Sequence, residues 1–426
     1  MGKRIAAVVG VYLLITAAWL VLGGSMSVRS MDLSRKLSPE VAGLWGNRQV
    51  QQAPELEFGW WTTKIETEEV TDPATKKTKI VTRTRQVIER KPVILEKSTV
   101  NVALDLAHRQ KGLLWYSTYQ VDFAGEYGYR QNEDRDGFLF VTYRFPTSQA
   151  SYDDFRFQLQ GRPDLQPREI SGGDGKALQY SVPVRRGEHV DFTLAYRSRG
   201  LDFWRYSFGS SVDQVRNFTL TMNTNFADID FPEGTISPNT KERRGDGWTL
   251  AWTFNNLISG YDIGMDMPAK LNPGPLAAQI SFFAPLSLLF FFIWLFVITL
   301  LRKVDLHPLN YLFLGAAFFA FHLLFAYTVD HLALIPAFLL SSAVSVFLVV
   351  SYLRLVVGLR FAALEAGGAQ VLYLVLFSYA HFYEGWTGLI VTCGSIVTLF
   401  VLMQLTGRIN WSEKFGQAKV PTAQRV

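Results

Sequence analysis

The chain has 426 residues, of which 49% are hydrophobic, and it carries a formal net charge of +5. Its single cysteine, Cys393, excludes an intramolecular disulfide, a zinc finger and a Cys-x-x-Cys redox pair. Much of the basic excess lies beside long apolar runs, so the charge indicates membrane topology and not the binding of nucleic acid. The length suits one membrane bundle with one or two water-facing modules.

Six apolar runs approach or exceed the length needed to cross a bilayer, which takes about 20 residues of helix. The first run, residues 5–24, has a basic start and is longer than the roughly 7–15 apolar residues of a signal peptide. No clean Ala-x-Ala cleavage pattern follows it, so we expect an uncleaved signal anchor. The other five runs predict an α-helical transmembrane bundle at residues 276–301, 309–329, 332–353, 361–383 and 386–405.

The basic residues beside these runs predict how the chain crosses the membrane. They gather at residues 3–4, 302–303, 354–360 and 408–425, whereas the turns at residues 330–331 and 383–385 hold no Lys or Arg. Because short loops rich in Lys and Arg stay in the cytoplasm, residues 1–4 and the tail 406–426 are expected there. Residues 25–275 then face outward, into a periplasm or its equivalent. That segment has Lys and Arg of its own, but long translocated segments escape the rule.

Alternation of apolar and polar residues dominates the outward segment. The alternating or strand-like runs lie at residues 112–121, 137–145, 188–200, 218–222 and 250–254. Turn signals separate such runs at residues 136–137, 172–173 and 246–247. This pattern predicts an all-β, sandwich-like domain. A helix is expected to lead into it within residues 30–53, starting at Ser38-Pro39-Glu40.

Residues 62–88 stand out in this domain as a predicted hairpin that is polar on both faces. The acidic arm carries Glu66, Glu68 and Glu69, and the basic arm carries Lys79, Arg83 and Arg85. Opposite charges across a hairpin stabilise its pairing by about 0.2–1 kcal/mol per pair. The hairpin is either a projecting arm that touches a partner or anionic headgroups, or a solvated edge whose charges prevent edge-to-edge aggregation.

Four polar residues are expected at the outer face of the bundle, namely Asp330, His331, His381 and Glu384. Carboxylates and imidazoles at one level could bind a divalent cation or act as general acid and base. Their spacing matches no metalloprotease or hydrolase motif, and caps of helix ends explain them equally well. We therefore predict no catalytic, metal-binding or cofactor-binding residue, and no cofactor.

Two polar residues lie within the predicted spans. His322 is in the middle of one, where a polar side chain is costly and suggests function. A neutral histidine bonded to a neighbouring helix is the structural alternative. Glu365 lies just inside another span, about a turn from Arg360, and either an interfacial pair with Arg360 or snorkelling of its side chain explains it.

Several segments of the C-terminal region carry a family resemblance, namely Arg302-Lys303, residues 307–315, Asp330-His331, Tyr352-Leu353-Arg354 and Arg408-Ile409-Asn410-Trp411. In these segments the region resembles the membrane region of CreD-type inner-membrane proteins. The outward domain matches the family only in patches, such as residues 109–114, so the chain resembles a divergent member. The resemblance implies an inner-membrane protein of Gram-negative bacteria, tied to envelope integrity and stress response and without an established enzymatic activity.

Three functions remain open from the sequence. The first is a non-enzymatic envelope protein whose outward β domain binds a periplasmic or inner-membrane protein partner, peptidoglycan or lipid, with the bundle as its anchor in the lipid bilayer. The second is a transporter or lipid-handling protein, and the third is a membrane enzyme that uses Asp330, His331 and Glu384. We favour the first. The oligomeric state and the identity of the partner do not follow from the sequence.

Overall fold

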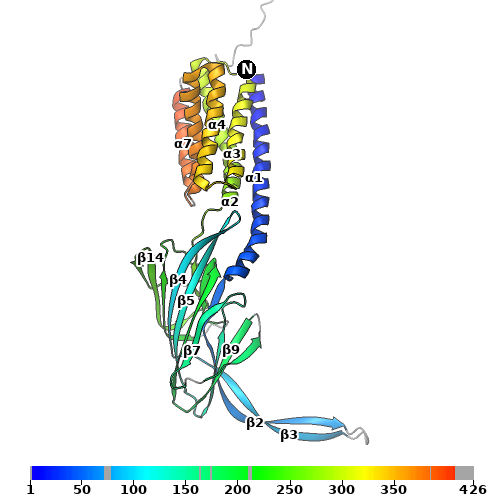
Figure 1. Ribbon diagram of the computed structural model, residues 1–426, viewed down its shortest axis with the longest axis vertical. Coiled ribbons are helices and arrows are strands. Elements are labelled where there is room, and N and C mark those ends of the chain that lie inside the picture. The colour runs from blue at the N-terminus through cyan, green and yellow to red at the C-terminus, as the bar shows by residue number, and fades with distance from the viewer. Residues whose placement is uncertain are drawn as a thin grey trace, which may run out of the picture. The chain divides into compact units, whose positions relative to one another are not determined.

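The computed structural model describes residues 2–71, 78–162, 165–172, 175–209, 214–383 and 385–407. It consists of two compact units (Figure 1). The helical unit comprises residues 1–36, 112–114 and 271–426, and the β unit comprises residues 37–111 and 115–270. A large β-sheet part together with helices apolar enough to span a membrane confirms the predicted fold class.

One long helix, α1, runs from Gly2 to Trp45. The expected helix start at Ser38-Pro39 is therefore wrong, because Pro39 lies inside α1. The good helix formers around it, such as Leu, Lys, Arg and Ala, favour continuation of the helix. The helix ends at Gly46, whose φ is +119°. A Cβ at Gly46 would lie 2.1 Å from the carbonyl oxygen of Arg199, so glycine alone fits at this helix end.

The β unit is built from fifteen strands within the residues that the structure describes. They are β1 (Gln49–Gln52), β2 (Glu55–Thr71), β3 (Thr78–Val93), β4 (Lys97–Lys111), β5 (Leu114–Arg130), β6 (Gly137–Arg144), β7 (Tyr152–Leu159), β8 (Arg168–Gly172), β9 (Gly175–Val184), β10 (His189–Leu201), β11 (Phe203–Ser207), β12 (Gln214–Thr224), β13 (Thr240–Arg244), β14 (Gly247–Ile258) and β15 (Ile263–Asp266).

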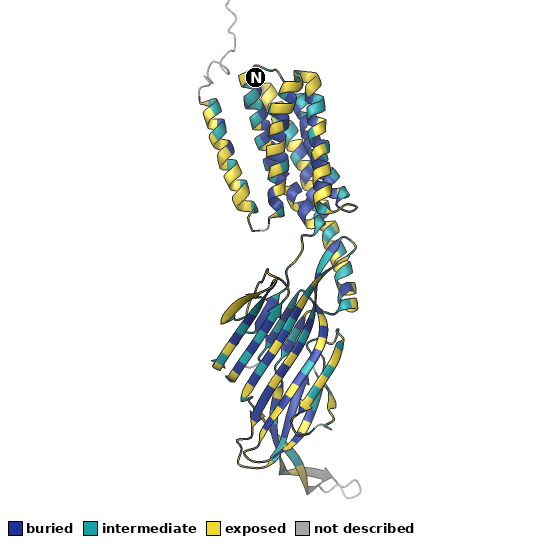
Figure 2. Cartoon of the chain, turned by 60° about the vertical axis from the view of Figure 1, so that its left-hand side comes forward, coloured by how far each residue is buried: buried dark blue, intermediate teal, exposed yellow. Residues whose placement is uncertain are grey.

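These strands form three sheets. Their orders are β13-β14-β12-β4-β5-β10-β7, β3-β2-β6-β9-β8 and β1-β11-β15. Most pairs are antiparallel, but β12 pairs with β4 and β1 with β11 in parallel, which the hairpin signals in the sequence did not indicate. Alternate residues are buried in strands such as β4, β10 and β12, as Figure 2 shows along the sheets. In β10 the buried residues include Val190, Phe192, Leu194 and Tyr196, all part of the domain core.

The helical unit carries the remaining candidate spans. Its elements are α2 (Pro273–Arg302), α3 (Pro308–Thr328), α4 (Leu334–Val357), a fifth span over Phe361–Phe382 and α7 (Thr387–Thr406). With α1, six helices of the described chain are long and apolar enough to cross a membrane. The fifth span is irregular, because two stretches, η1 (Phe361–Gly367) and η2 (Val371–Leu376), are π-helical.

The two ends of this bundle are named here after Asp305 and Asp330. At the Asp305 end, α2 ends and α3 begins; at the Asp330 end, α3 ends and α4 begins. The core of the bundle is aromatic and aliphatic and contains Phe291, Phe318 and Phe321. α7 buries Thr398 and Leu402, whereas Leu399 and Phe400 are exposed. Such an apolar exposed face suits contact with lipid.

Candidate functional site

Two ion pairs join helix α1 to the residues that flank the two ends of helix α3. At the Asp305 end, Nη1 of Arg4 lies 2.6 Å from Oδ1 of Asp305. At the Asp330 end, Arg29 donates to the carboxylate of Asp330, whose side chain is 15% exposed. The two arginines are 25 residues apart, and so are the two aspartates (29 − 4 = 25; 330 − 305 = 25). α1 therefore runs parallel to α3 in matched register.

The contacts between these two ion pairs keep the same register. The side chain of Ile15 packs on Gly315, where a Cβ would lie 2.1 Å from Cδ1 of Ile15. Trp19 packs edge-on against His322 with ring centroids 5.2 Å apart. Small residues let membrane helices approach closely, so Gly315 is the position that admits α1 to the bundle.

The four polar residues predicted at the outer face have separate surroundings. The carboxylate of Asp330 is occupied by Arg29. His331 is exposed in the turn that follows. His381 is buried, its Nδ1 lies 3.3 Å from the carbonyl oxygen of Phe377, and its ring centroid lies 5.0 Å from that of Phe283 with the two rings tilted. Glu384 lies outside the described residues. Among the described residues, no group of three or more His, Cys, Asp or Glu side chains could hold a metal ion.

His322 is buried at the contact between α1 and α3. Its Nδ1 donates to the carbonyl oxygen of Phe318 at 3.0 Å, one turn earlier in its own helix. A histidine that donates through Nδ1 and is neutral keeps an acceptor at Nε2. Within the described part of the chain, this Nε2 and the indole Nε1 of Trp19 have no hydrogen-bond partner. The expected bond from His322 to a neighbouring helix is therefore replaced by a bond within α3 and a ring contact with α1.

The fifth span joins its neighbours through polar side chains. Nε2 of Gln370 donates to Oγ of Ser345 on α4 at 2.8 Å, and that hydroxyl donates to the carbonyl oxygen of Ala317 on α3 at 2.6 Å. Hydrogen bonds between helices take the place of a hydrophobic driving force inside a membrane. Gln370 lies between η1 and η2, and π-helical turns are frequent at functional sites.

Glu365 has a different partner from the one expected. Its Oε1 lies 2.6 Å from Nη2 of Arg302, at the end of α2, so the prediction of a pair with Arg360 is wrong. Arg302 lies far from Glu365 in the chain, so the local spacing of Arg360 and Glu365 could not indicate this contact. The pair ties the fifth span to α2.

The interior of the β unit holds a buried polar network that sequence patterns did not reveal. Oε1 of Gln51 on β1 accepts hydrogen bonds from the hydroxyls of Tyr143, at 2.9 Å, and Tyr196, at 2.7 Å. Burial raises the pKa of both tyrosine hydroxyls well above the ordinary value. The network joins β1 to β6 and β10 and is satisfied by neutral groups, so it stabilises the fold and offers no reactive group.

The predicted hairpin is longer than residues 62–88 and forms an arm of the β unit. Its strands β2 and β3 pair continuously from Leu56 with Val93 to Thr71 with Thr78. β2 pairs with β6 only over Glu55–Gly59. From Trp60 onward, the described arm is a two-stranded ribbon with no third strand, and Figure 1 shows β2 and β3 leaving the body of the sheets. β3 is also an edge strand.

The two faces of this arm differ, which corrects the expectation of a polar surface on both. One face carries Trp61, Thr63 and Ile65, opposite Ile88, Gln86 and Thr84. Trp61 is 58% exposed and Ile65 is 66% exposed. The other face carries Lys64 and Glu66, opposite Arg85 and Arg83. We call the first of these the Trp61 face. Its period of two, from Trp61 through Thr63 to Ile65, is visible in the sequence.

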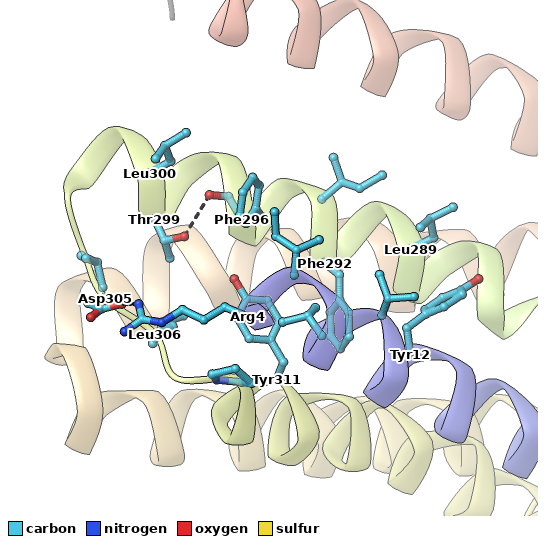
Figure 3. A pocket seen from close by; sticks show the side chains of 16 residues that line it. Arg4, Tyr12, Leu289, Phe292, Phe296, Thr299, Leu300, Asp305, Leu306 and Tyr311 are labelled. Carbon is cyan, nitrogen blue, oxygen red and sulfur yellow. Dashed lines mark hydrogen bonds and ion pairs between the residues drawn. The ribbon is translucent and has the colours of Figure 1, made fainter. Parts of the chain in front are cut away.

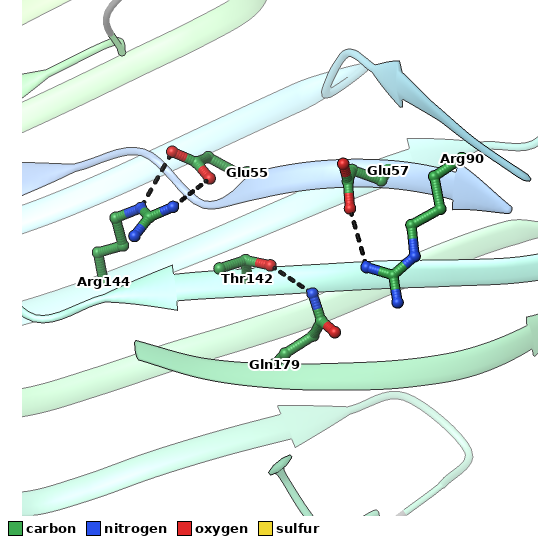
Figure 4. A network of polar contacts seen from close by, with 6 residues as sticks. All are labelled: Glu55, Glu57, Arg90, Thr142, Arg144 and Gln179. Atoms are coloured by element: carbon green, nitrogen blue, oxygen red, sulfur yellow. Dashed lines mark hydrogen bonds and ion pairs between the residues drawn. The ribbon is translucent and has the colours of Figure 1, made fainter. Parts of the chain in front are cut away.

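Polar contacts anchor the root of the arm in the five-stranded sheet (Figure 4). Arg144 of β6 donates to both carboxylate oxygens of Glu55, each at 3.2 Å. Arg90 of β3 donates to Glu57 at 3.2 Å, and its guanidinium lies 3.8 Å from the ring centroid of Phe140. These contacts join β2 to β6 on one side and to β3 on the other, at the base of the arm.

Comparison with known proteins shows a similarity over much of the C-terminal helical segment. Residues 280–412 match the family model described as Inner membrane protein CreD. This match confirms the resemblance carried by the segments between residues 302 and 411. No curated protein matches the chain.

Solved structures resemble the chain only remotely. A putative nutrient binding protein from Legionella pneumophila subsp. pneumophila str. Philadelphia 1 is 9% identical, with 46% of this chain and 74% of that chain covered and a TM-score of 0.30. An M1 zinc metallopeptidase from Deinococcus radiodurans is 10% identical, with 76% and 91% covered and a TM-score of 0.26. A variant of that peptidase is 11% identical, with 41% and 42% covered and a TM-score of 0.26. This chain thus spans less than half of the variant's length, and likenesses of this size assign no activity.

Proposed function

We propose, from the match of residues 280–412 to the family model described as Inner membrane protein CreD, that the protein is a non-enzymatic inner-membrane protein of envelope integrity and stress response. Its β unit faces the periplasm and binds another envelope protein through the Trp61 face of the arm. The six helices anchor this unit in the bilayer.

The orientation rests on the charges at the two ends of the bundle. Lys3, Arg4, Arg302 and Lys303 belong to the Asp305 end, whereas the turn at the Asp330 end carries Asp330 and His331. Because short loops rich in Lys and Arg remain in the cytoplasm, the Asp305 end and both termini are cytoplasmic. The long segment between α1 and α2 is then periplasmic.

The exposure of the Trp61 face is the observation that supports the proposed binding of a partner protein. An isolated two-stranded ribbon is marginally stable in water, and exposed aromatic side chains are enriched at protein interfaces. Trp61 meets the ring of Phe138 edge-on, yet more than half of its side chain and of that of Ile65 stays exposed. A partner that covers them would bury apolar area and stabilise the ribbon in the same step. The charged face, with Lys64 and Glu66, would stay in water and keep the edge soluble.

Site-specific photocrosslinking in intact cells tests this proposal. A photoreactive residue at position 65 should capture another envelope protein. The control is position 242, because Glu242 lies on β13, an equally exposed edge strand of the β unit. Capture of a second copy of this chain alone would replace partner binding with self-association. Capture of nothing, or the same products from both positions, would contradict the proposal.

A further inference from the structure

A groove of about 540 Å³ lies in the helical unit at the Asp305 end. It is bounded by the first turns of α1, the last turns of α2 and the residues that lead into α3. Figure 3 shows Tyr12, Leu289, Phe292 and Tyr311 along it and Arg4 extending toward Asp305 at its end. Its volume is within the range of about 300–1,000 Å³ that is typical of ligand sites.

The walls of the groove require an apolar occupant. Its two hydroxyl groups on α1 and α2 are already bonded, since Thr299 donates to the carbonyl oxygen of Phe296 at 2.9 Å and Tyr12 donates to that of Pro285 at 3.3 Å. The hydroxyl of Tyr311 on α3 also lines the groove and interacts with Thr299. The rest of the wall is aliphatic or aromatic, with Leu289 and Ile293 partly exposed. A cavity without free polar partners does not hold ordered water. In helices that cross hydrocarbon, the available apolar molecule is a lipid acyl chain.

The mouth of the groove is cationic. Arg4 uses one guanidinium nitrogen on Asp305 and its side chain is 59% exposed, so further N–H donors remain for a ligand. Lys3 precedes Arg4, and Lys303 lies two residues before Asp305. Lys3 and Lys303 thus add positive charge next to the residues that line this end of the groove. Guanidinium groups bind phosphate through paired hydrogen bonds, and clustered Lys and Arg beside a membrane span favour anionic headgroups.

We propose that this groove is a binding site for an anionic phospholipid, with one acyl chain along α1 and α2 and the phosphate at Arg4. Arg4 is then the residue that selects the headgroup, and Leu289 and Phe292 contact the chain. Asp305 holds the guanidinium toward the mouth in the absence of lipid. The site is independent of the arm and of its partner.

Retention of defined lipids by the full-length protein tests the site. The protein is reconstituted in nanodiscs with equal amounts of phosphatidylglycerol and phosphatidylcholine, extracted, and measured by native mass spectrometry. We expect at least a tenfold preference for phosphatidylglycerol. Arg4→Gln should abolish the preference while some lipid is retained, and Arg4→Lys should restore part of it. Leu289→Trp, which fills the groove, should remove the bound lipid altogether.

Two controls separate this site from the general lipid shell. Leu399→Trp alters a leucine on α7 that lies outside the groove and is more exposed than Leu289, and Arg244→Gln removes an exposed cation of the β unit. Both should retain phosphatidylglycerol as the unaltered protein does. Equal retention of the two lipids by the unaltered protein, or equal loss in Leu289→Trp and Leu399→Trp, would overturn the proposal.

Discussion

Arg29 on α1 and Asp330 in the turn after α3 form an ion pair between residues 301 positions apart in the chain. Arg4 and Asp305 repeat this separation at the other end of the bundle. At 1.5 Å per residue, 25 residues of helix span about 38 Å, which exceeds the roughly 30 Å of hydrocarbon in a bilayer. Both pairs can therefore lie at headgroup level, where they fix the register of α1 against α3.

Loss of Arg29 alone should cost more stability than loss of Asp330 alone or loss of both partners of the Arg29–Asp330 pair. Arg29→Gln leaves the carboxylate of Asp330 uncompensated while its side chain is only 15% exposed, whereas Asp330→Asn leaves an arginine that can reach water. We expect a coupling of about 1 kcal/mol in a double-mutant cycle, since Arg29 is partly exposed. Thermal unfolding of the detergent-solubilised protein measures it. Additive effects of the two single substitutions would show that the pair does not set the register.

Crowding at Gly315 should displace α1. Gly315→Ala places a methyl group where Cδ1 of Ile15 lies 2.1 Å away. Overpacking of this kind typically costs about 1–3 kcal/mol, so the melting temperature should fall. Ile15→Val removes Cδ1 and should recover most of the loss in the double variant. If Ile15→Val gave no recovery, the close approach of α1 to Gly315 would not account for the effect.

The sequence predicted what depends on local pattern and missed what depends on contacts between distant residues. Apolar length located the spans, and alternation located strands such as β10, because both periods are properties of a single element. Gln51 could not be singled out, since its role depends on Tyr143 and Tyr196, which are far away in the chain. The partner of Asp330 was missed for the same reason.

The buried tyrosines of the β unit predict loss of stability at alkaline pH. Burial raises the pKa of Tyr180 to about 12, and it raises that of Tyr143 well above the ordinary value of 10. The folded state therefore binds more protons than the unfolded state above pH 10, and stability falls as the pH rises toward 12. Below pH 10 this contribution is fully present.

Absorbance and circular dichroism recorded together during an alkaline titration measure this effect. The phenolate signal of the buried tyrosines should appear together with the loss of β structure. Tyr143→Phe should reduce the dependence of the unfolding free energy on pH by about one proton in this range. Phenolate formation by most tyrosines with the sheets intact would contradict the prediction.

Removal of the Trp61 face should separate stability from partner binding. Trp61 and Ile65 are exposed, so Trp61→Ala combined with Ile65→Ala should change the free energy of unfolding by no more than about 0.5 kcal/mol. A photoreactive residue at position 84, which is opposite Ile65, should then capture the partner with at least tenfold lower yield. The matched control is Lys64→Ala combined with Glu66→Ala on the charged face, which should leave the yield within about twofold, because peripheral charges contribute little to affinity. Equal losses from the two faces would mean that the ribbon as a whole, and not its apolar side, is what the partner recognises.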